Sequence, residues 1–416
     1  MRKTILHVCG FPILILAQLA SSQDYLSTRL PTLGGKHTQP FAINKSGQVV
    51  GASDTATPFV EHAFFWSKTT GMQDLGTFGG PESVALAIND SGQVVGAADT
   101  PSSNERAFLW SEASGLQDLG TLGGSSSRAS GINNKGEVVG VAMIPTGAMR
   151  AFLWSAAIGM QDLGEIGVPG MINDNEQVIG AYSPGSGLIH AFLWTQSEGR
   201  QDLGTLGGSV TIAAAINASG QVTGFSDNPL ELPHAFLWTQ AEGMEDLGTF
   251  GGNISAAAGN NDIGQIVGGF KTSSQHGSER AFVWRQASGA TILIDKKSDA
   301  KAINTAGQIV GKVYQTATLW TPNMHTALGS SKNLSQVGEL VTFTVTVNSV
   351  QGPPPDGETV TFKDGSKVLA KMALSGGTAN FSTSSLKPGS HDMRARYAGD
   401  VNYSPSKSAI VTQVVQ

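Results

Sequence analysis

His62-Ala63-Phe64-Phe65-Trp66 is one copy of a stretch that recurs along most of this chain. The other copies follow the pattern His/Arg-Ala-Phe-x-Trp or a reduced form of it, and they end at Trp110, Trp154, Trp194, Trp238, Trp284 and Trp320. All seven tryptophans thus hold one position of a repeat, with separations of 44, 44, 40, 44, 46 and 36 residues. A period of this length is typical of stacked supersecondary units.

A second motif, Ile-Asn-x-x-Gly-Gln-Val-Val-Gly, begins at Ile43 and has seven copies. Its asparagine is present in all of them: Asn44, Asn89, Asn133, Asn173, Asn217, Asn261 and Asn304. Glycine follows three residues later in six copies, and Glu176 replaces it in the other. Glycine supplies the positive φ of a short hairpin, and asparagine tolerates neighbouring turn positions. The motif predicts a hairpin. A calcium loop at Asp90-Ser91-Gly92 is disfavoured, because alternating oxygen ligands and a closing bidentate carboxylate are absent.

Each unit contains about four short strands, and no stretch has helical periodicity. Phe64 and Trp66 face one side of their strand and Phe65 faces the other, so the strand is covered on both sides. This pattern predicts an all-β fold: a seven-bladed β-propeller with about four strands per 40–45-residue repeat. An open β-solenoid is the alternative. In a closed ring, residues 25–33 are expected to pair with the sheet of Leu319-Trp320, although residues 326–329 compete for that place.

Three segments are expected: a signal peptide at 1–22, the repeat region at 23–329 and a small β-sandwich at 330–416. Arg2 and Lys3 precede an apolar run that is too short to span a bilayer, and small residues follow at 20–22. The only cysteine, Cys9, lies in this signal, so no disulfide is expected in the mature chain. The tail alternates apolar residues with threonine and has about seven short strands, as an Ig-like sandwich does.

A third motif, Asp-Leu-Gly-Thr-x-Gly-Gly, follows the aromatic strand, as at residues 74–80. The three repeated motifs together resemble the bacterial HAF repeat over about residues 28–329, although three copies carry Arg in place of His. That resemblance implies a probable extracellular repeat protein without an established activity. The tail resembles a bacterial Ig-like domain through Val360-Thr361-Phe362-Lys363-Asp364-Gly365, residues 386–391 and residues 397–403. Such domains usually act as spacers or adhesive modules.

The cation before Ala-Phe and the acid of Asp-Leu-Gly recur together, as in His62 and Asp74. We expect them to form structural hydrogen bonds between neighbouring strands or blades rather than a cationic ring around a ligand. The scattered histidines, His37, His276, His325 and His391, have no metal-ligand spacing. The Gly-Gly pairs lack the lysine and helix of a phosphate loop. No catalytic, cofactor-binding or metal-binding residue is predicted.

The formal net charge is −6 with 14% charged residues, and no basic run is present, so nucleic acid is not an expected partner. We expect a secreted or cell-surface, monomeric, non-catalytic scaffold that binds a glycan or protein and does not insert into the membrane. A polysaccharide hydrolase or lyase and a purely structural envelope component are the alternatives. Binding is expected at the non-repeated connections, because loops on a rigid scaffold usually carry it. These are residues 52–61, 97–105, 141–149, 181–189, 225–233 and 269–279.

Overall fold

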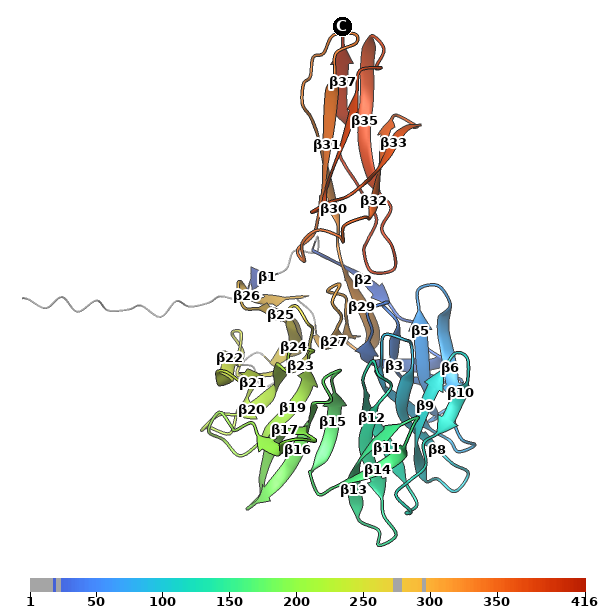
Figure 1. Ribbon diagram of the computed structural model, residues 1–416, viewed down its shortest axis with the longest axis vertical. Helices are drawn as coiled ribbons and strands as arrows, with labels where there is room; N and C mark the ends of the chain where they lie inside the picture. Colours follow the sequence, from blue (N-terminus) through green and yellow to red (C-terminus); the bar gives the residue numbers. More distant parts are fainter. Residues whose placement is uncertain (1–17, 20–23, 272–278, 294–296) are drawn as a thin grey trace, which may run out of the picture.

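The computed structural model describes residues 18–19, 24–271, 279–293 and 297–416. Every regular element in these residues is a β-strand. The repeat region folds into seven successive sheets, which are consistent with propeller blades, and the C-terminal segment folds into a sandwich (Figure 1). Cys9, His276 and all of the predicted signal except β1 (Gln18–Leu19) lie outside the described residues.

The seven sheets are numbered here in chain order. Sheet 1 contains β3 (Gly34–Ile43), β4 (Val49–Thr55), β5 (Glu61–Ser67) and β6 (Gly71–Gly76). Sheet 2 contains β7 (Ser83–Ile88), β8 (Val94–Asp99), β9 (Glu105–Ser111) and β10 (Gly115–Asp118). Sheet 3 contains β11 (Ser127–Ile132), β12 (Val138–Met143), β13 (Met149–Ser155) and β14 (Gly159–Gly164). Sheet 4 contains β15 (Val168–Ile172), β16 (Val178–Gly185), β17 (Leu188–Thr195) and β18 (Gly199–Asp202).

The remaining three sheets repeat this antiparallel order. Sheet 5 contains β19 (Thr211–Ile216), β20 (Val222–Asp227), β21 (Pro233–Thr239) and β22 (Gly243–Gly248). Sheet 6 contains β23 (Ile254–Asn260), β24 (Ile266–Lys271), β25 (Glu279–Arg285) and β26 (Gly289–Ile292), with β1 parallel at its edge. Sheet 7 contains β27 (Ser298–Ile303), β28 (Ile309–Val313), β29 (Thr316–Pro322) and β2 (Tyr25–Arg29).

Sheet 7 combines strands from both ends of the repeat region. β2 pairs antiparallel with β29 along its whole length, from Tyr25 opposite Pro322 to Arg29 opposite Thr318. The expected pairing of the N-terminal segment with the strand of Leu319-Trp320 is therefore confirmed. Because β2 occupies this edge, it supplies the fourth strand that the last repeat lacks.

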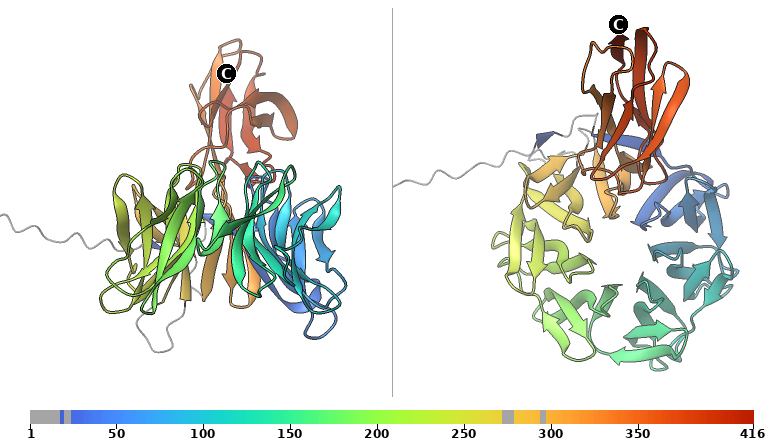
Figure 2. Two further views of the ribbon diagram at one scale, coloured as in Figure 1. Left: turned by 60° about the horizontal axis from the view of Figure 1, so that its bottom comes forward. Right: turned by 45° about the horizontal axis from the view of Figure 1, so that its top comes forward.

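The sheets stand side by side around a ring, with their first strands innermost (Figure 2). Each first strand contacts the first strand of the next sheet, in the order β3, β7, β11, β15, β19, β23 and β27, and β27 contacts β3. A cavity at the centre of the ring is lined by residues from the ends of these seven strands.

The aromatic stretch forms the core between sheets. Phe64 and Trp66 pack with Val310 and Leu319 of sheet 7, whereas Phe65 packs on the other side with Trp110 of sheet 2. The predicted alternation of faces is therefore confirmed. Corresponding clusters join all the remaining pairs of neighbouring sheets, so hydrophobic burial holds the units to one another.

The glycine that ends each Val-Val-Gly motif is required by a close backbone approach. Gly96 in β8 lies beside a bulge in β7, and a Cβ at this position would be 1.9 Å from the carbonyl oxygen of Val84. All seven sheets have the same bulge in the first strand. A side chain at this glycine would therefore push the first two strands apart.

The sandwich consists of two sheets in the part of the chain that the structure describes. One contains β30 (His325–Ser330), β31 (Val341–Asn348) and β34 (Thr378–Thr383). The other contains β32 (Thr359–Asp364), β33 (Lys367–Ala373), β35 (Gly389–Tyr397), β36 (Ser406–Lys407) and β37 (Val411–Val415). A single core between them includes Phe343, Phe362 and Tyr397.

The expected boundary between residues 329 and 330 differs from the observed strand pairing. β30 pairs with β31 over its full length, so residues 325–329 lie in the sandwich sheet. The edge of sheet 7 for which residues 326–329 were a candidate is already occupied by β2. The C-terminal sandwich therefore takes one strand that the sequence pattern assigned to the repeat.

The sandwich contacts the ring at turns between strands and at β2. Gln308 donates to the carbonyl oxygen of Val401 at 3.1 Å, and the Gln351 side chain hydrogen-bonds Gln265 and Tyr25. Lys68, in the turn between β5 and β6, donates to the carbonyl oxygen of Asp400 at 2.9 Å. These contacts all involve one face of the ring, which we call the asparagine face because it carries the Asn turns.

Candidate functional site

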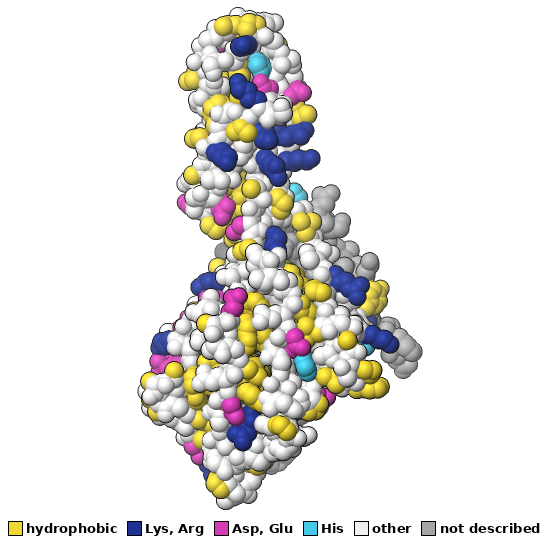
Figure 3. Space-filling model, turned by 90° about the vertical axis from the view of Figure 1, so that its right-hand side faces the viewer, with side chains coloured by type: hydrophobic (Ala, Val, Ile, Leu, Met, Phe, Trp, Pro, Cys, Tyr) yellow, Lys and Arg dark blue, Asp and Glu magenta, His cyan; other side chains and the backbone are white. Residues whose placement is uncertain are grey.

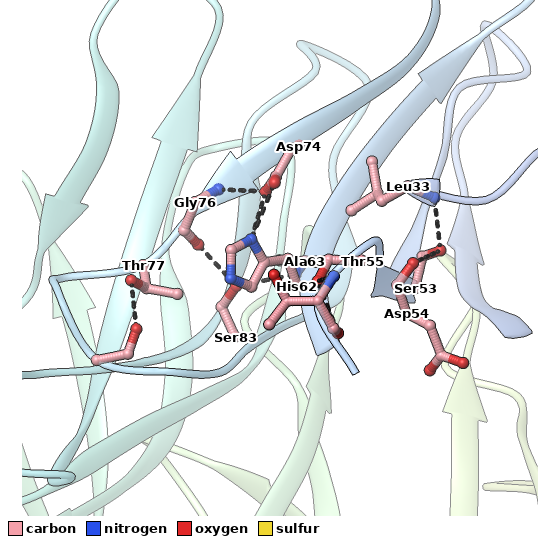
Figure 4. A network of polar contacts seen from close by, with 12 residues as sticks. Leu33, Ser53, Asp54, Thr55, His62, Ala63, Asp74, Gly76, Thr77 and Ser83 are labelled. Carbon is pink, nitrogen blue, oxygen red and sulfur yellow. Dashed lines mark hydrogen bonds and ion pairs between the residues drawn. The ribbon is translucent and has the colours of Figure 1, made fainter. Parts of the chain in front are cut away.

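The recurrent cation and acid pair across the third and fourth strands of one sheet. His62 Nδ1 lies 2.9 Å from an Asp74 carboxylate oxygen (Figure 4). His190 and His234 pair with Asp202 and Asp246 at 2.7 and 2.8 Å, and Arg106 lies 3.7 Å from Asp118. The expectation of structural pairs between neighbouring strands is confirmed for these four. Arg150 differs, because it pairs with Glu165 at 3.3 Å.

The same acid also fixes the end of the fourth strand. Asp74 Oδ1 accepts the amide of Gly76 at 2.8 Å, and the carbonyl oxygen of Gly76 accepts the hydroxyl of Ser83 from sheet 2 (Figure 4). That hydroxyl oxygen in turn accepts the amide of Ala63 at 2.8 Å. The cation–acid pair therefore belongs to a network that joins neighbouring sheets, and its groups have protein partners rather than facing a ligand.

We expect the Asp202→Asn change to cost stability at neutral pH and progressively less in acid. Burial raises the pKa of Asp202, but hydrogen bonds from His190, the Gly204 amide and Tyr182 outweigh it and lower the pKa below 3.8. A carboxyl with a depressed folded-state pKa stabilises the fold above its unfolded pKa, and this contribution is lost as pH falls through the folded-state pKa. Thermal unfolding midpoints of wild type and variant, compared at about pH 6 and at about pH 3, measure the difference in their stability at each pH.

Asp162→Asn is the matched control, because Asp162 accepts the Gly164 amide while Arg150 of its sheet pairs with Glu165. A smaller effect at neutral pH is expected there. A wild-type advantage over Asp202→Asn that persisted unchanged at about pH 3 would contradict the assignment.

The seven asparagines link each sheet to the next. Each side-chain amide donates to the backbone carbonyl of the following asparagine at 2.9–3.2 Å, and Asn304 donates to Asn44. Each side-chain oxygen accepts an amide from its own turn, as Asn133 does from Glu137 at 2.9 Å. The predicted hairpin is confirmed, with Gly47 at φ 71° and Glu176 at φ 60°. These asparagines are buried and satisfied within the protein.

The asparagine face holds a central cavity of about 190 Å³ that is lined mainly by repeat positions. The polar residues after the asparagines bond to one another around it. The ammonium group of Lys45 lies 3.2 Å from the Asp90 carboxylate, and the hydrogen bond with Asp90 and its negative charge raise the pKa of Lys45. Asn134 donates to Asp90 and Asp174. Part of this face is also covered by the sandwich. Lys45 is the one cation beside three lining carboxylates, Asp90, Asp174 and Asp262, but each of these carboxylates accepts hydrogen bonds from the ring itself. The asparagine face therefore offers a ligand few unpartnered groups.

The non-repeated connections join the second and third strands of each sheet. Because the strands are antiparallel, these connections emerge on the face opposite the asparagine turns, which we call the loop face. Much of their length is strand: β4 ends at Thr55 and β5 begins at Glu61. The tips are exposed, with Phe59 at 101% and Leu230 at 77% exposure. Residues 272–278 of the sixth connection lie outside the described residues.

One cavity on the loop face contains residues that depart from the repeat. It has a volume of about 290 Å³ and is lined by residues of sheets 1, 2 and 3, of which the charged ones are Glu61, Glu82, Asp99, Glu105 and Arg128. Arg128 Nη1 lies 2.7 Å from Glu105, so one acid is neutralised. Gln39 and Phe41 of β3 also line it. This loop-face cavity is the candidate functional site.

The surroundings of Glu61 in this cavity raise the pKa of its carboxyl. Burial raises the pKa of its carboxyl, and the nearby carboxylates of Asp54 and Glu82 raise it further. Asp54 is itself paired with His37 at 2.9 Å. Neighbouring negative charges disfavour ionisation of the Glu61 carboxyl. The cavity therefore combines one carboxyl with a raised pKa, that of Glu61, with three further acidic side chains and one arginine.

Two of these residues mark repeat positions that change character. Glu82 corresponds to Ser126 and Val210 in sheets 3 and 5, and Arg128 corresponds to Val84 and Ile212. Neither Glu82 nor Arg128 was predicted from the sequence as a site residue. Both stand out as charged exceptions when the repeats are aligned, and this is the signal that could have identified them. Among the residues that the structure describes, no group of three or more His, Cys, Asp or Glu side chains is arranged to hold a metal ion.

Comparison with known proteins places the C-terminal segment in a family. Residues 328–416 match the model of the bacterial Ig-like domain (group 3), and no HAF-repeat family model matches the chain. No curated protein matches the chain. Within the described residues, no helix is long and apolar enough to cross a membrane.

Solved structures resemble the chain weakly. TolB from Acinetobacter baumannii is 13% identical over 66% of this chain and 79% of its own, with a TM-score of 0.39. A gluconolactonase from Xanthomonas campestris is 8% identical over 72% and 99%, with a TM-score of 0.36. The extracellular domain of a hybrid two component system from B. thetaiotaomicron is 9% identical over 90% and 50%, with a TM-score of 0.33. TM-scores below 0.5 say nothing about the function of this protein.

Proposed function

We infer that residues 25–322 form a closed seven-bladed β-propeller of the HAF-repeat type. The contact of β27 with β3 and the bond from Asn304 to Asn44 support closure. An open solenoid would leave its last unit far from its first. Closure also removes exposed sheet edges, which is the usual benefit of this architecture.

The function we propose is non-catalytic binding of a glycan or protein by a secreted or cell-surface scaffold. The carrying observation is the loop-face cavity, where Glu82 and Arg128, which depart from the repeat, gather with Glu61, Asp99 and Glu105 on the face away from the sandwich. The asparagine face, in contrast, is lined mainly by satisfied repeat residues. The Ig-like sandwich serves as a spacer that presents the loop face outward. The mature chain is proposed to be monomeric, without a cofactor and without membrane insertion.

A glycan array and a pull-down with the mature chain, residues 23–416, test this proposal. Glu61→Gln combined with Glu82→Gln is expected to weaken capture at least about tenfold, the equivalent of 1.4 kcal/mol. Glu198→Gln combined with Glu242→Gln is the matched control, because these exposed acids lie in turns on the asparagine face. Equal binding by all three proteins, or no captured ligand, would contradict loop-face binding.

A second candidate is a polysaccharide hydrolase or lyase, favoured specifically by the raised pKa of Glu61 beside Glu82. Glycoside hydrolysis uses one protonated and one ionised carboxyl on either side of the bond. Release of reducing ends by the wild type, abolished by Glu61→Gln, would favour this alternative. If no ligand is captured and no bond is cleaved, a purely structural envelope role remains.

A further inference from the structure

The sandwich carries a concentration of positive charge on an otherwise acidic protein. Residues 330–416 contain eight Lys and Arg and six Asp and Glu, whereas residues 1–329 contain 18 and 26. In Figure 3, Lys and Arg side chains gather on one side of the sandwich. The ring in the same view shows no comparable group. This local charge differs in sign from the chain as a whole.

Strand register explains how the cations come together. Lys363 of β32 lies directly opposite Arg394 of β35, and Arg396 lies opposite Lys407 of β36. Thr361 lies opposite both Arg396 and Lys371, which extends the row to β33. The alternate residues of β35, such as Met393 and Ala395, are buried in the core. The cations therefore share the outer face of this sheet.

We call Lys363, Lys371, Arg394, Arg396 and Lys407 the basic face. Four of them line an open hollow of about 480 Å³ together with Gly365, Pro405 and Ser406. Among the described residues, no carboxylate forms an ion pair with any of the five, and the Nε of Arg394 is buried without a hydrogen-bond partner. Alternation along β35 places one acid, Asp392, two residues before Arg394, on the same outer face of the sheet, but it forms no ion pair with any of the five cations.

Like charges directly opposite one another in a sheet destabilise it. Lys363 with Arg394, and Arg396 with Lys407, are two such pairs. A multivalent anion bound across the face would reverse this unfavourable term by charge-assisted hydrogen bonds to the guanidinium groups. The arrangement is therefore unfavourable when empty and favourable when an anion covers it.

We propose that the basic face binds an anionic polysaccharide, through its carboxylate or sulfate groups. The row of cations crosses four strands, and strands lie about 4.8 Å apart, so the face fits an extended polyanion rather than a single small ion. Single-stranded nucleic acid is disfavoured, because base recognition relies on exposed aromatic platforms. Tyr397 in β35 is fully buried, and Tyr403 packs against the core. This inference is independent of the ligand proposed for the loop face.

The test measures binding of the full mature chain to immobilised alginate, a polyuronate, and heparin, a polysulfate, with neutral dextran as the blank. We expect the wild type to bind at least one of the two acidic polymers and to lose affinity as salt rises from about 50 to 300 mM. Changing Lys363, Arg394, Arg396 and Lys407 together to Gln is expected to weaken binding at least about tenfold.

The matched control removes four exposed cations from the ring by changing them to Gln: Lys36, Lys135, Lys271 and Lys297. It is expected to change affinity less than about twofold, although it lowers the net charge equally. A thermal midpoint of the basic-face variant equal to or above that of the wild type would show that the loss is not unfolding, as relief of like-charge pairs requires. Loop-face variants at Glu61 and Glu82 should leave this binding unchanged.

Three results would overturn the proposal. The first is the absence of salt-sensitive binding of the wild type to both acidic polymers. The second is an equal loss of affinity in the ring control, which would indicate attraction by overall charge. The third is tighter binding to a single-stranded oligonucleotide than to either polysaccharide, which would identify nucleic acid as the partner. Failure of the loop-face pull-down would leave this test intact, because the two sites lie in different domains.

Discussion

Trp110→Ala is expected to lower the free energy of unfolding by about 3–5 kcal/mol, the usual cost of truncating a large buried aromatic side chain. Trp110 is 4% exposed, and the centroid of its ring lies 5.3 Å from the ring centroid of Phe65 in the neighbouring sheet. The change would leave a cavity between sheets 1 and 2, where Val94 and Phe108 also pack. Chemical denaturation followed by circular dichroism measures the loss.

Glu112→Ala, in the exposed turn after the same strand, is the control and should change stability by less than about 0.5 kcal/mol. If Trp110→Ala left stability unchanged and abolished ligand binding instead, the aromatic stretch would be a binding element and not core. The outcome therefore distinguishes a packing role from a recognition role for all seven copies.

Asn133→Ala is expected to cost about 2–4 kcal/mol, because it removes several hydrogen bonds from a buried position. Asn133 donates to the carbonyl oxygen of Asn173 at 3.2 Å and to Glu137 at 2.7 Å. It accepts the amides of Lys135 and Glu137. The carbonyl of Asn173 would lose its partner from sheet 3, and the turn would lose its internal brace. The same denaturation experiment measures the effect.

Asn134→Ala provides a closely matched control. Asn134 accepts the amide of Asp90 and donates to Asp90 and Asp174, so it also makes several hydrogen bonds. It is exposed, however, and water can replace the lost partners. We expect a cost below about 1 kcal/mol. Equal losses in the two variants would mean that burial of Asn133 does not determine its contribution.

Much of the fold was predictable because its signals are local. Alternation of Phe64, Phe65 and Trp66 indicates a strand covered on both faces, and the burial of all three agrees. The Asn-x-x-Gly spacing indicates a hairpin, and Gly92 adopts φ 79° as such a turn requires. The pairing of residues 325–329 with the sandwich was not predictable from the sequence. It depends on whether these residues or β2, about 300 residues earlier in the chain, pair with the edge of sheet 7.

The candidate sites were less accessible from the sequence. The non-repeated connections indicated the loop face, but not that Glu61 and Glu82, from different sheets, share one cavity with Arg128. The absence of a basic run in the sequence also suggested no basic surface. Lys363, Arg394 and Lys407 lie far apart in the chain, and only strand pairing brings them onto one face.

The His62–Trp66 stretch and its copies determined by themselves the repeat, its strands and its buried faces, because periodicity and side-chain volume act within a few residues. The tertiary structure decided what each polar side chain bonds. Asn44 and Asn304 are 260 residues apart, yet one donates to the other because the sheets meet around a ring. Contacts between units follow from their arrangement in space, and a repeat sequence alone does not specify which charged residues that arrangement brings together.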